Sequence, residues 1–130
     1  MGHDAAVAII YHFGNSIPTV DELRLPTNAV LILAVLADGY SHGFAIRREI
    51  DARTAGHVRI GVTTLYRMLN QLQKAELVEE SSERPSPQFD NERRRYFSIT
   101  TAGRRVLRDE IKKLERVVAA LRPLASKART

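Results

Sequence analysis

The side chains with the clearest capacity for chemistry lie in one stretch, residues 59–77. Apolar residues recur there at helical spacing and predict one buried face, made of Leu65, Met68, Leu69 and Leu72. The opposite face combines hydroxyl, phenol, amide and cationic groups, which can bond to base edges in a DNA major groove and hold phosphates. The candidate nucleic-acid contacts of this stretch are Thr63, Thr64, Tyr66, Arg67, Asn70 and Lys74. An ordinary helix with a solvated polar face would have the same pattern.

The charge of the chain is unevenly distributed. The 130 residues have a net charge of +5. Residues 1–41 contain one arginine and four acidic residues, a balance of −3, so the remaining 89 residues carry +8. A basic segment attracts phosphate-rich partners by electrostatic steering and counterion release. A merely soluble basic protein would share this composition.

The composition also argues against several classes of function. The absence of cysteine excludes disulfides, thiolate metal sites and cysteine nucleophiles, and it agrees with a reducing cytoplasm. No GxGxxG or Walker pattern occurs and the histidines are scattered, so we expect no enzyme activity, no cofactor and no metal. The longest apolar run, residues 29–37, is well short of the ~20 residues of a membrane-spanning helix. We expect a cytoplasmic protein without a membrane partner.

Two apolar helices are expected in the first part of the chain. A short one covers residues 5–13. Residues 29–36 are apolar almost all round, which predicts a buried helix. Thr27 or Asn28 is its expected N-cap, and Asp38-Gly39 is expected to end it.

Two further helices follow. One is expected to begin at Ser41 and to run to about Ala55-Gly56. The other is the two-faced stretch described above, with Gly61 at its N-cap. Three helices within about 50 residues, with a short glycine-containing connector before the third, predict a helix-turn-helix module.

The period changes after residue 77. Val78–Ser82 and Arg95–Thr100 are strand candidates, and the proline-containing segment between them is typical of a loop. A hairpin directly after a recognition helix is the wing of a winged helix domain. Arg94 and Arg95 on the returning side are candidate DNA contacts, although a solvated charge run would have the same composition.

The last helix is expected from Ala102 to about Arg122, with Thr100 or Thr101 as its cap and Pro123 interrupting it. Its apolar residues alternate at spacings of four and three, which is the pattern of a coiled-coil seam. The seam consists of Leu107, Ile111, Leu114, Val118 and Leu121. The pattern favours dimerisation with a second copy, because two-fold dimers are the commonest closed assembly. Packing on the helix's own domain is the alternative.

Four motifs together resemble the PadR family of bacterial transcriptional regulators, named for the phenolic acid decarboxylase repressor. They are the buried helix of residues 29–36, the block Asp38–Ile46, Thr64-Leu65-Tyr66, and the segment Arg95–Arg104. The likeness spans roughly residues 26–121, and the short C-terminus resembles the smaller PadR subgroup with a single dimerisation helix. One departure is Gly61-Val62-Thr63, where the family usually has Ser-Pro-Gly.

The resemblance implies a homodimeric winged helix repressor that binds double-stranded DNA with an inverted repeat and releases it when a small aromatic or drug-like effector binds. Ser41 and His42 become candidate DNA contacts, with His42 able to cap a helix, pack or touch a phosphate. Gly43 is expected where another helix crosses closely. A winged helix adaptor that docks another protein instead of DNA is the alternative function.

The expected fold class is mainly α with a small β-hairpin. It comprises an N-terminal extension (residues 1–25), a winged helix-turn-helix DNA-binding domain (26–101) and a long C-terminal dimerisation helix with its tail (102–130). At this length the chain is expected to form one compact core.

Overall fold

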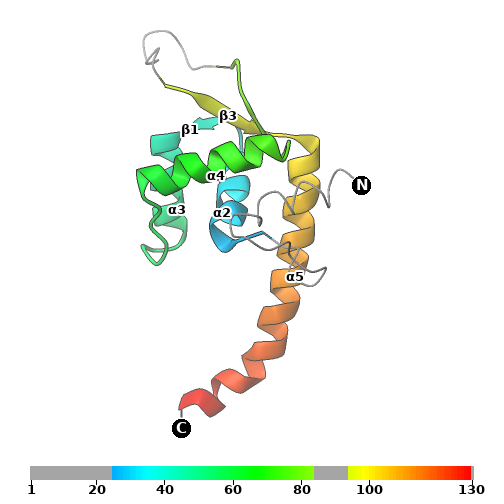
Figure 1. Cartoon of the computed structure of the whole chain (residues 1–130). Helices are drawn as coiled ribbons and strands as arrows, with labels where there is room; N and C mark the ends of the chain where they lie inside the picture. The colour runs from blue at the N-terminus through cyan, green and yellow to red at the C-terminus, as the bar shows by residue number, and fades with distance from the viewer. Residues whose placement is uncertain (1–24, 84–93, 130) are drawn as a thin grey trace, which may run out of the picture.

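The computed structural model describes residues 25–83 and 94–129. The elements in chain order are α2 (Thr27–Leu36), β1 (Ser41–His42), α3 (Gly43–Arg53), α4 (Val62–Lys74), β2 (Val78–Glu80), β3 (Tyr96–Ile99), α5 (Thr101–Ala125) and the 3-10 turn η3 (Lys127–Arg129). Figure 1 shows α2, α3 and α4 gathered into one body, with the strands along one edge and α5 extending away from it. This is the winged helix arrangement that the sequence predicts. The expected helix over residues 5–13 and most of the wing loop lie outside the described residues.

The centre of the core is α2, whose residues Ile32 and Leu33 are fully buried. The predicted N-cap is wrong. Pro26 occupies that position without a side-chain bond, and its carbonyl accepts the first helical hydrogen bond from the Val30 amide at 3.1 Å. Pro26 itself is extended, with a ψ of 151°, so the helix begins one residue later, at Thr27. The predicted end is confirmed, since Gly39 has a φ of 145° just after the last turn.

The boundaries of α3 differ from the prediction at both ends. Ser41 and His42 form the short strand β1, which pairs antiparallel with β3, so α3 begins at Gly43. Two residues are too few for an alternating pattern to reveal a strand. The helix ends at Arg53, because Ala55 and Gly56 have φ values of 50° and 77° that a helix cannot continue through.

The sheet has three antiparallel strands in the order β1-β3-β2. The two predicted strands of the hairpin are confirmed in shortened form, with Val78 opposite Ile99 and Glu80 opposite Phe97. Phe97 of β3 is completely buried in the core, whereas Tyr96 points to the other side and packs edge-on against His42. The central strand therefore fastens the wing to the helical body.

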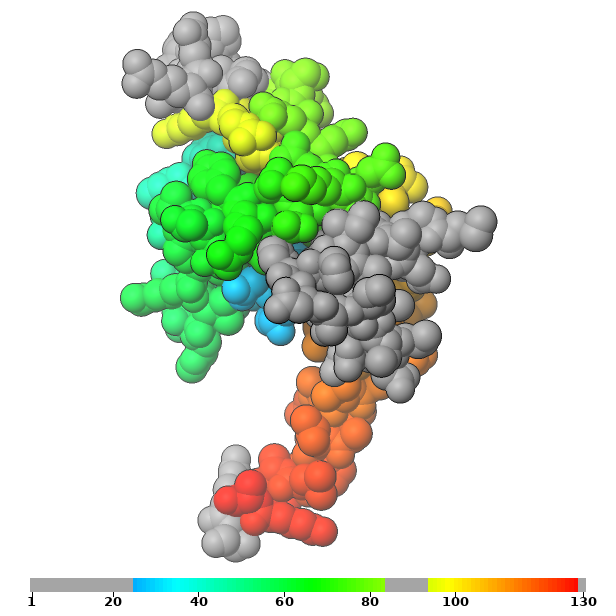
Figure 2. Space-filling model, in the orientation of Figure 1, coloured from blue at the N-terminus to red at the C-terminus, as the bar shows by residue number. Residues whose placement is uncertain are grey.

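The long helix α5 is capped by Thr100, one of the two predicted caps, whose Oγ1 accepts from the Gly103 amide at 2.9 Å. Its first turns pack on the core, with Val106 buried, and its second half extends away from the body (Figures 1 and 2). The expected interruption at Pro123 does not occur, because the helix continues to Ala125. Proline removes only one hydrogen bond there, and the helix has two residues left to run.

Gly103 is where α5 crosses closest to the strand side of the core. A Cβ at this position would overlap sterically with the Leu77 carbonyl oxygen and would lie 2.7 Å from Cγ1 of Ile99. Backbone cannot yield as a flexible side chain can, so we expect Gly103→Ala to lower the free energy of unfolding by about 1–3 kcal/mol. Chemical denaturation monitored by circular dichroism measures this loss.

The control for Gly103→Ala is Gly61→Ser. A Cβ on Gly61 meets nothing within 4 Å, and a serine would supply the N-cap side chain that α4 lacks. We expect it to stabilise the protein by a few tenths of a kcal/mol. Equal effects of the two substitutions would show that the close approach at Gly103 does not control stability.

Candidate nucleic-acid interface

The two faces of α4 are confirmed by burial. Leu65, Met68, Leu69 and Leu72 are at most 6% exposed, which fixes the helix on the core. The opposite face is exposed at Thr63, Tyr66, Arg67, Asn70 and Lys74, while Thr64 is half-buried. The helix contains no acidic residue and ends at Lys74, because Glu76 turns the chain with a φ of 62°. The outcome is an exposed surface of hydrogen-bonding and cationic groups on α4. Figure 2 shows this helix, in green, on the surface of the body.

The start of α4 is held against the start of α3. A Cβ on Gly43 would lie 2.5 Å from the hydroxyl oxygen of Tyr66 and 3.3 Å from Leu65, so the expected close crossing at Gly43 is confirmed. A larger residue there would displace the Tyr66 side chain. The phenol of Tyr66 thus points towards α3, and the residue as a whole is 39% exposed.

Side chains of α3 also fix the connector that leads into α4. The Nε of Arg47 donates to the Ile60 carbonyl at 2.8 Å, one residue before the Gly61 N-cap. The hydroxyl of Thr54 accepts from the Val58 amide at 3.0 Å and donates to the Ile50 carbonyl at 2.8 Å. These bonds hold the connector against α3 and so fix the orientation of α4 relative to α3.

The structure adds cationic residues that the sequence analysis missed. Arg48 lies over the ring of Phe44 at 5.5 Å, and Arg59 pairs with Asp51 at 3.4 Å. They border a depression of about 380 Å³ between α3 and the connector, lined by Phe44, Arg47, Arg48, Asp51, Arg59 and Ile60. The four-residue spacing of Phe44 and Arg48, which places both on one helical face, is the signal that could have revealed this surface.

Ser41 and His42 lie in β1 beside the start of α3. The Nδ1 of His42 accepts from the Ala45 amide at 3.3 Å, so the expected capping role is confirmed. Burial lowers the pKa of His42 below its usual value, and the nearby charges of Arg94 and Arg48 lower it further. The ring is therefore neutral at pH 7, and its Nε2 carries the proton and can donate a hydrogen bond.

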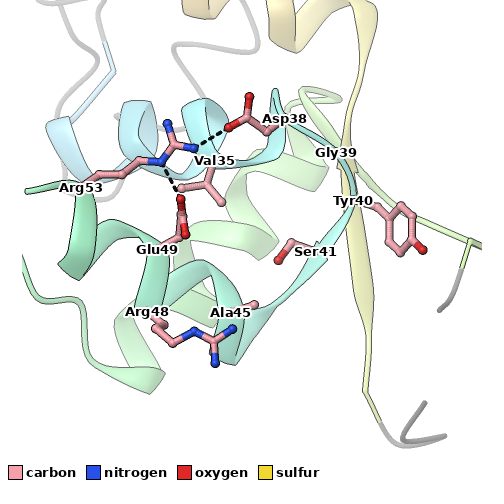
Figure 3. Close-up of a pocket in the computed structure, with 9 residues that line it drawn as sticks. All are labelled: Val35, Asp38, Gly39, Tyr40, Ser41, Ala45, Arg48, Glu49 and Arg53. Atoms are coloured by element: carbon pink, nitrogen blue, oxygen red, sulfur yellow. Dashed lines mark hydrogen bonds and ion pairs between the residues drawn. The ribbon is translucent and has the colours of Figure 1, made fainter. Parts of the chain in front are cut away.

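A second, smaller depression of about 200 Å³ lies between the end of α2 and α3 (Figure 3). Arg53 reaches between two carboxylates there, with its Nε 2.8 Å from Glu49 and an Nη 2.5 Å from Asp38. All three side chains are largely exposed, so these pairs contribute little to stability. The positive charge of Arg53 is locally compensated.

The family-level comparison agrees with this architecture. Residues 32–109 match the model of the family described as "Transcriptional regulator PadR-like family". The chain belongs to the PadR-like family of transcriptional regulators. The matched segment runs from α2 through the wing into the first half of α5 and contains all candidate DNA contacts.

Known proteins similar to this PadR-like chain differ in length. A 37.1 kDa protein in a transposon of Streptomyces fradiae is 36% identical over 95 residues, which cover 73% of this chain but only 25% of that protein. A protein of Lysinibacillus sphaericus is 30% identical over 82 residues, 63% of this chain and 72% of that one. The crystal structure of a PadR-like transcriptional regulator from Bacillus cereus has a TM-score of 0.64 at 19% identity, covering 75% of this chain and 90% of its own, which indicates a shared fold.

On the wing of this PadR-like chain, Arg95 is paired with Glu80. Both Nε and an Nη of Arg95 lie near the same carboxylate oxygen of Glu80, at 3.2 and 2.9 Å, and the guanidinium lies over Phe97 at 5.1 Å. Arg94, one residue earlier, is exposed. To contact a phosphate, Arg95 would have to exchange Glu80 for it.

The seam of α5 divides into a buried part and an exposed part. Leu107 is only 7% exposed and belongs to the core of its own chain. From Ile111 onwards the seam is open, with Leu114 43% and Leu121 56% exposed. A groove of about 340 Å³ on this part of the helix is lined by Ile111, Leu114, Glu115, Val118, Ala119 and Arg122.

Within residues 25–83 and 94–129, no helix is both long and apolar enough to cross a membrane. No group of three or more histidine, cysteine or acidic residues in them is arranged to hold a metal ion.

Proposed function

We propose that this chain is a sequence-specific repressor that binds double-stranded DNA as a homodimer. The observation that carries the proposal is the exposed face of α4, which has hydrogen-bonding groups and two cations but no carboxylate. Base edges require such groups, and helix-turn-helix proteins place the equivalent helix in the major groove. Arg67 and Asn70 are the proposed base readers, with Thr63, Thr64 and Lys74 beside them.

The cations around α4 have the complementary task of holding phosphates. Arg48 and Arg59 lie on one side of it, and Arg94 and Arg95 lie on the wing. The neutral His42 and the hydroxyls of Ser41 and Tyr66 are suited to phosphate oxygens as donors. Such contacts determine affinity and orientation on the duplex, whereas base contacts determine specificity.

The exposed seam of α5 supports the homodimer, with residues 102–130 as the dimerisation segment and 26–101 as the DNA-binding segment. Two recognition helices related by a two-fold axis need half-sites about 34–36 Å apart, and therefore an inverted repeat. An apolar cavity near the subunit boundary, where α2 and α5 come together, would suit an apolar ring. A small aromatic or drug-like compound bound there would release DNA by favouring a different spacing of the two α4 helices.

A mobility-shift titration on the DNA just upstream of the gene, at 50 to 200 mM salt, tests the proposal. We expect a specific complex that weakens by about 10³-fold over this range if six phosphates are contacted in the dimer. Addition of a panel of small aromatic compounds is expected to release the DNA.

A scrambled duplex is the control for specificity. Binding that does not depend on salt would favour the adaptor function, because protein docking releases few counterions. Equal affinity for operator and scrambled DNA would contradict sequence-specific recognition. If compounds of the panel bind the protein without changing its affinity for DNA, the proposal of a DNA-releasing effector is contradicted.

A further inference from the structure

Val62, the first residue of α4, is an exposed apolar side chain that does not contribute to the core. Its exposed fraction is 53%, and it is not part of the core cluster. Valine also has a lower helix propensity than alanine. Of the nine exposed large hydrophobic side chains in the described part of the chain, six lie on α5, and the other three are Phe44, Val62 and Tyr66. The exposed apolar groups of the winged helix module thus gather at the starts of α3 and α4.

The surroundings leave the Val62 side chain accessible. Gly61 before it has no side chain, and the space beside its Cα is open to 4 Å. Tyr66 is four residues later on the same face, but its hydroxyl end rests at Gly43 of α3. The next exposed residues on the face, Thr63 and Arg67, are polar. The isopropyl group of Val62 therefore lies at the N-terminal end of the exposed face of α4, whose neighbouring side chains can form hydrogen bonds.

The DNA major groove has one apolar feature that matches such a group. Each base edge presents hydrogen-bond donors and acceptors there, and only thymine adds a C5-methyl group. Residues at the N-terminus of a recognition helix are those that contact base edges. We propose that Val62 reads the C5-methyl group of one thymine in each half-site, an inference that rests on the proposed DNA binding and adds a specificity determinant to it.

Deoxyuridine provides the test, because it differs from thymidine only by the missing methyl group and keeps the same hydrogen bonds. Each thymine of the operator is replaced in turn, and the affinity of the unchanged protein is measured. At one thymine per half-site we expect a loss of about four-fold, which corresponds to one buried methyl group. Replacement of the thymines elsewhere in the operator should have no effect.

Val62→Ala assigns the methyl contact to this residue. The variant should bind the thymine operator more weakly and show no further loss with deoxyuridine at the sensitive position, since both changes remove the same contact. Phe44→Ala is the matched control, because it truncates another exposed apolar side chain and should keep the four-fold ratio. Val62 is exposed and alanine favours helices, so circular dichroism melting of Val62→Ala should show an intact fold.

Two results would overturn the inference while leaving DNA binding intact. One is equal affinity of the unchanged protein for thymine and deoxyuridine at every position. The other is a Val62→Ala variant that keeps the full dependence on the methyl group. Failure of the unchanged protein to prefer any operator would instead contradict the proposed function, and the inference with it.

Discussion

Leu114→Glu should convert the proposed homodimer into monomers. Leu114 lies in the exposed part of the α5 seam, 43% exposed in the single chain. Burying a leucine contributes about 2 kcal/mol, and the two-fold axis makes the loss occur twice. A glutamate would also face its own copy across the axis. We expect the dissociation constant of the dimer to rise by roughly 500-fold or more. Sedimentation at micromolar protein measures the change.

Ala120→Glu is the matched control for Leu114→Glu. It introduces the same charge on the same exposed half of α5, but residue 120 is two positions from Val118 and so lies off the seam. It should leave the dimer intact. A well-folded Leu114→Glu dimer would contradict the proposal that the seam forms the dimer interface. Dissociation of both variants would show that added charge on α5, rather than loss of the apolar face, separates the subunits. Monomeric Leu114→Glu should also lose binding to a two-half-site operator.

Arg67→Ala should reduce sequence preference more than it reduces affinity for DNA in general. Arg67 lies one turn into the exposed face of α4, four residues after Thr63. A bidentate arginine–guanine contact discriminates by about 1–3 kcal/mol, so the operator-to-scrambled ratio should fall by about 5- to 150-fold per half-site. Arg67→Lys keeps the charge but not the fork of donors, and it should lose most of the same preference.

The wing provides the contrast to Arg67. Arg94→Ala with Arg95→Ala should weaken operator and scrambled DNA alike and lower the salt slope, by about 0.9 for each phosphate contact removed. Titrations at several salt concentrations separate the two effects. If the wing variant loses specificity and Arg67→Ala does not, the two roles have been assigned in the wrong order.

The sequence by itself determined the helical body and the exposed face of α4. Burial of Leu65, Met68, Leu69 and Leu72 follows from helical spacing, which is a local property of the chain. The Thr100 cap is similarly local, because its hydroxyl bonds to an amide three residues later. Both signals lie within a few residues of each other, so no knowledge of distant contacts was needed.

Tertiary structure alone decided which exposed groups come together. The strand β1 exists because β3, more than fifty residues later, supplies its hydrogen-bonding partner. Arg48 and Arg59 share one depression only because α3 and the connector are packed against each other. Glu80 pairs with Arg95 across the hairpin, a contact between residues fifteen positions apart that the charge pattern alone did not reveal.

The seam of α5 shows the same division within one helix. Its spacing of four and three predicted an apolar stripe from Leu107 to Leu121, and the stripe is present. The spacing did not predict at which residue the stripe stops packing on the protein's own core. Leu107 is covered by its own chain, whereas Leu114 is not, because the helix extends beyond the body that its first turns pack against. Periodicity specifies a face of a helix, and only the packed fold determines how much of that face remains for a partner.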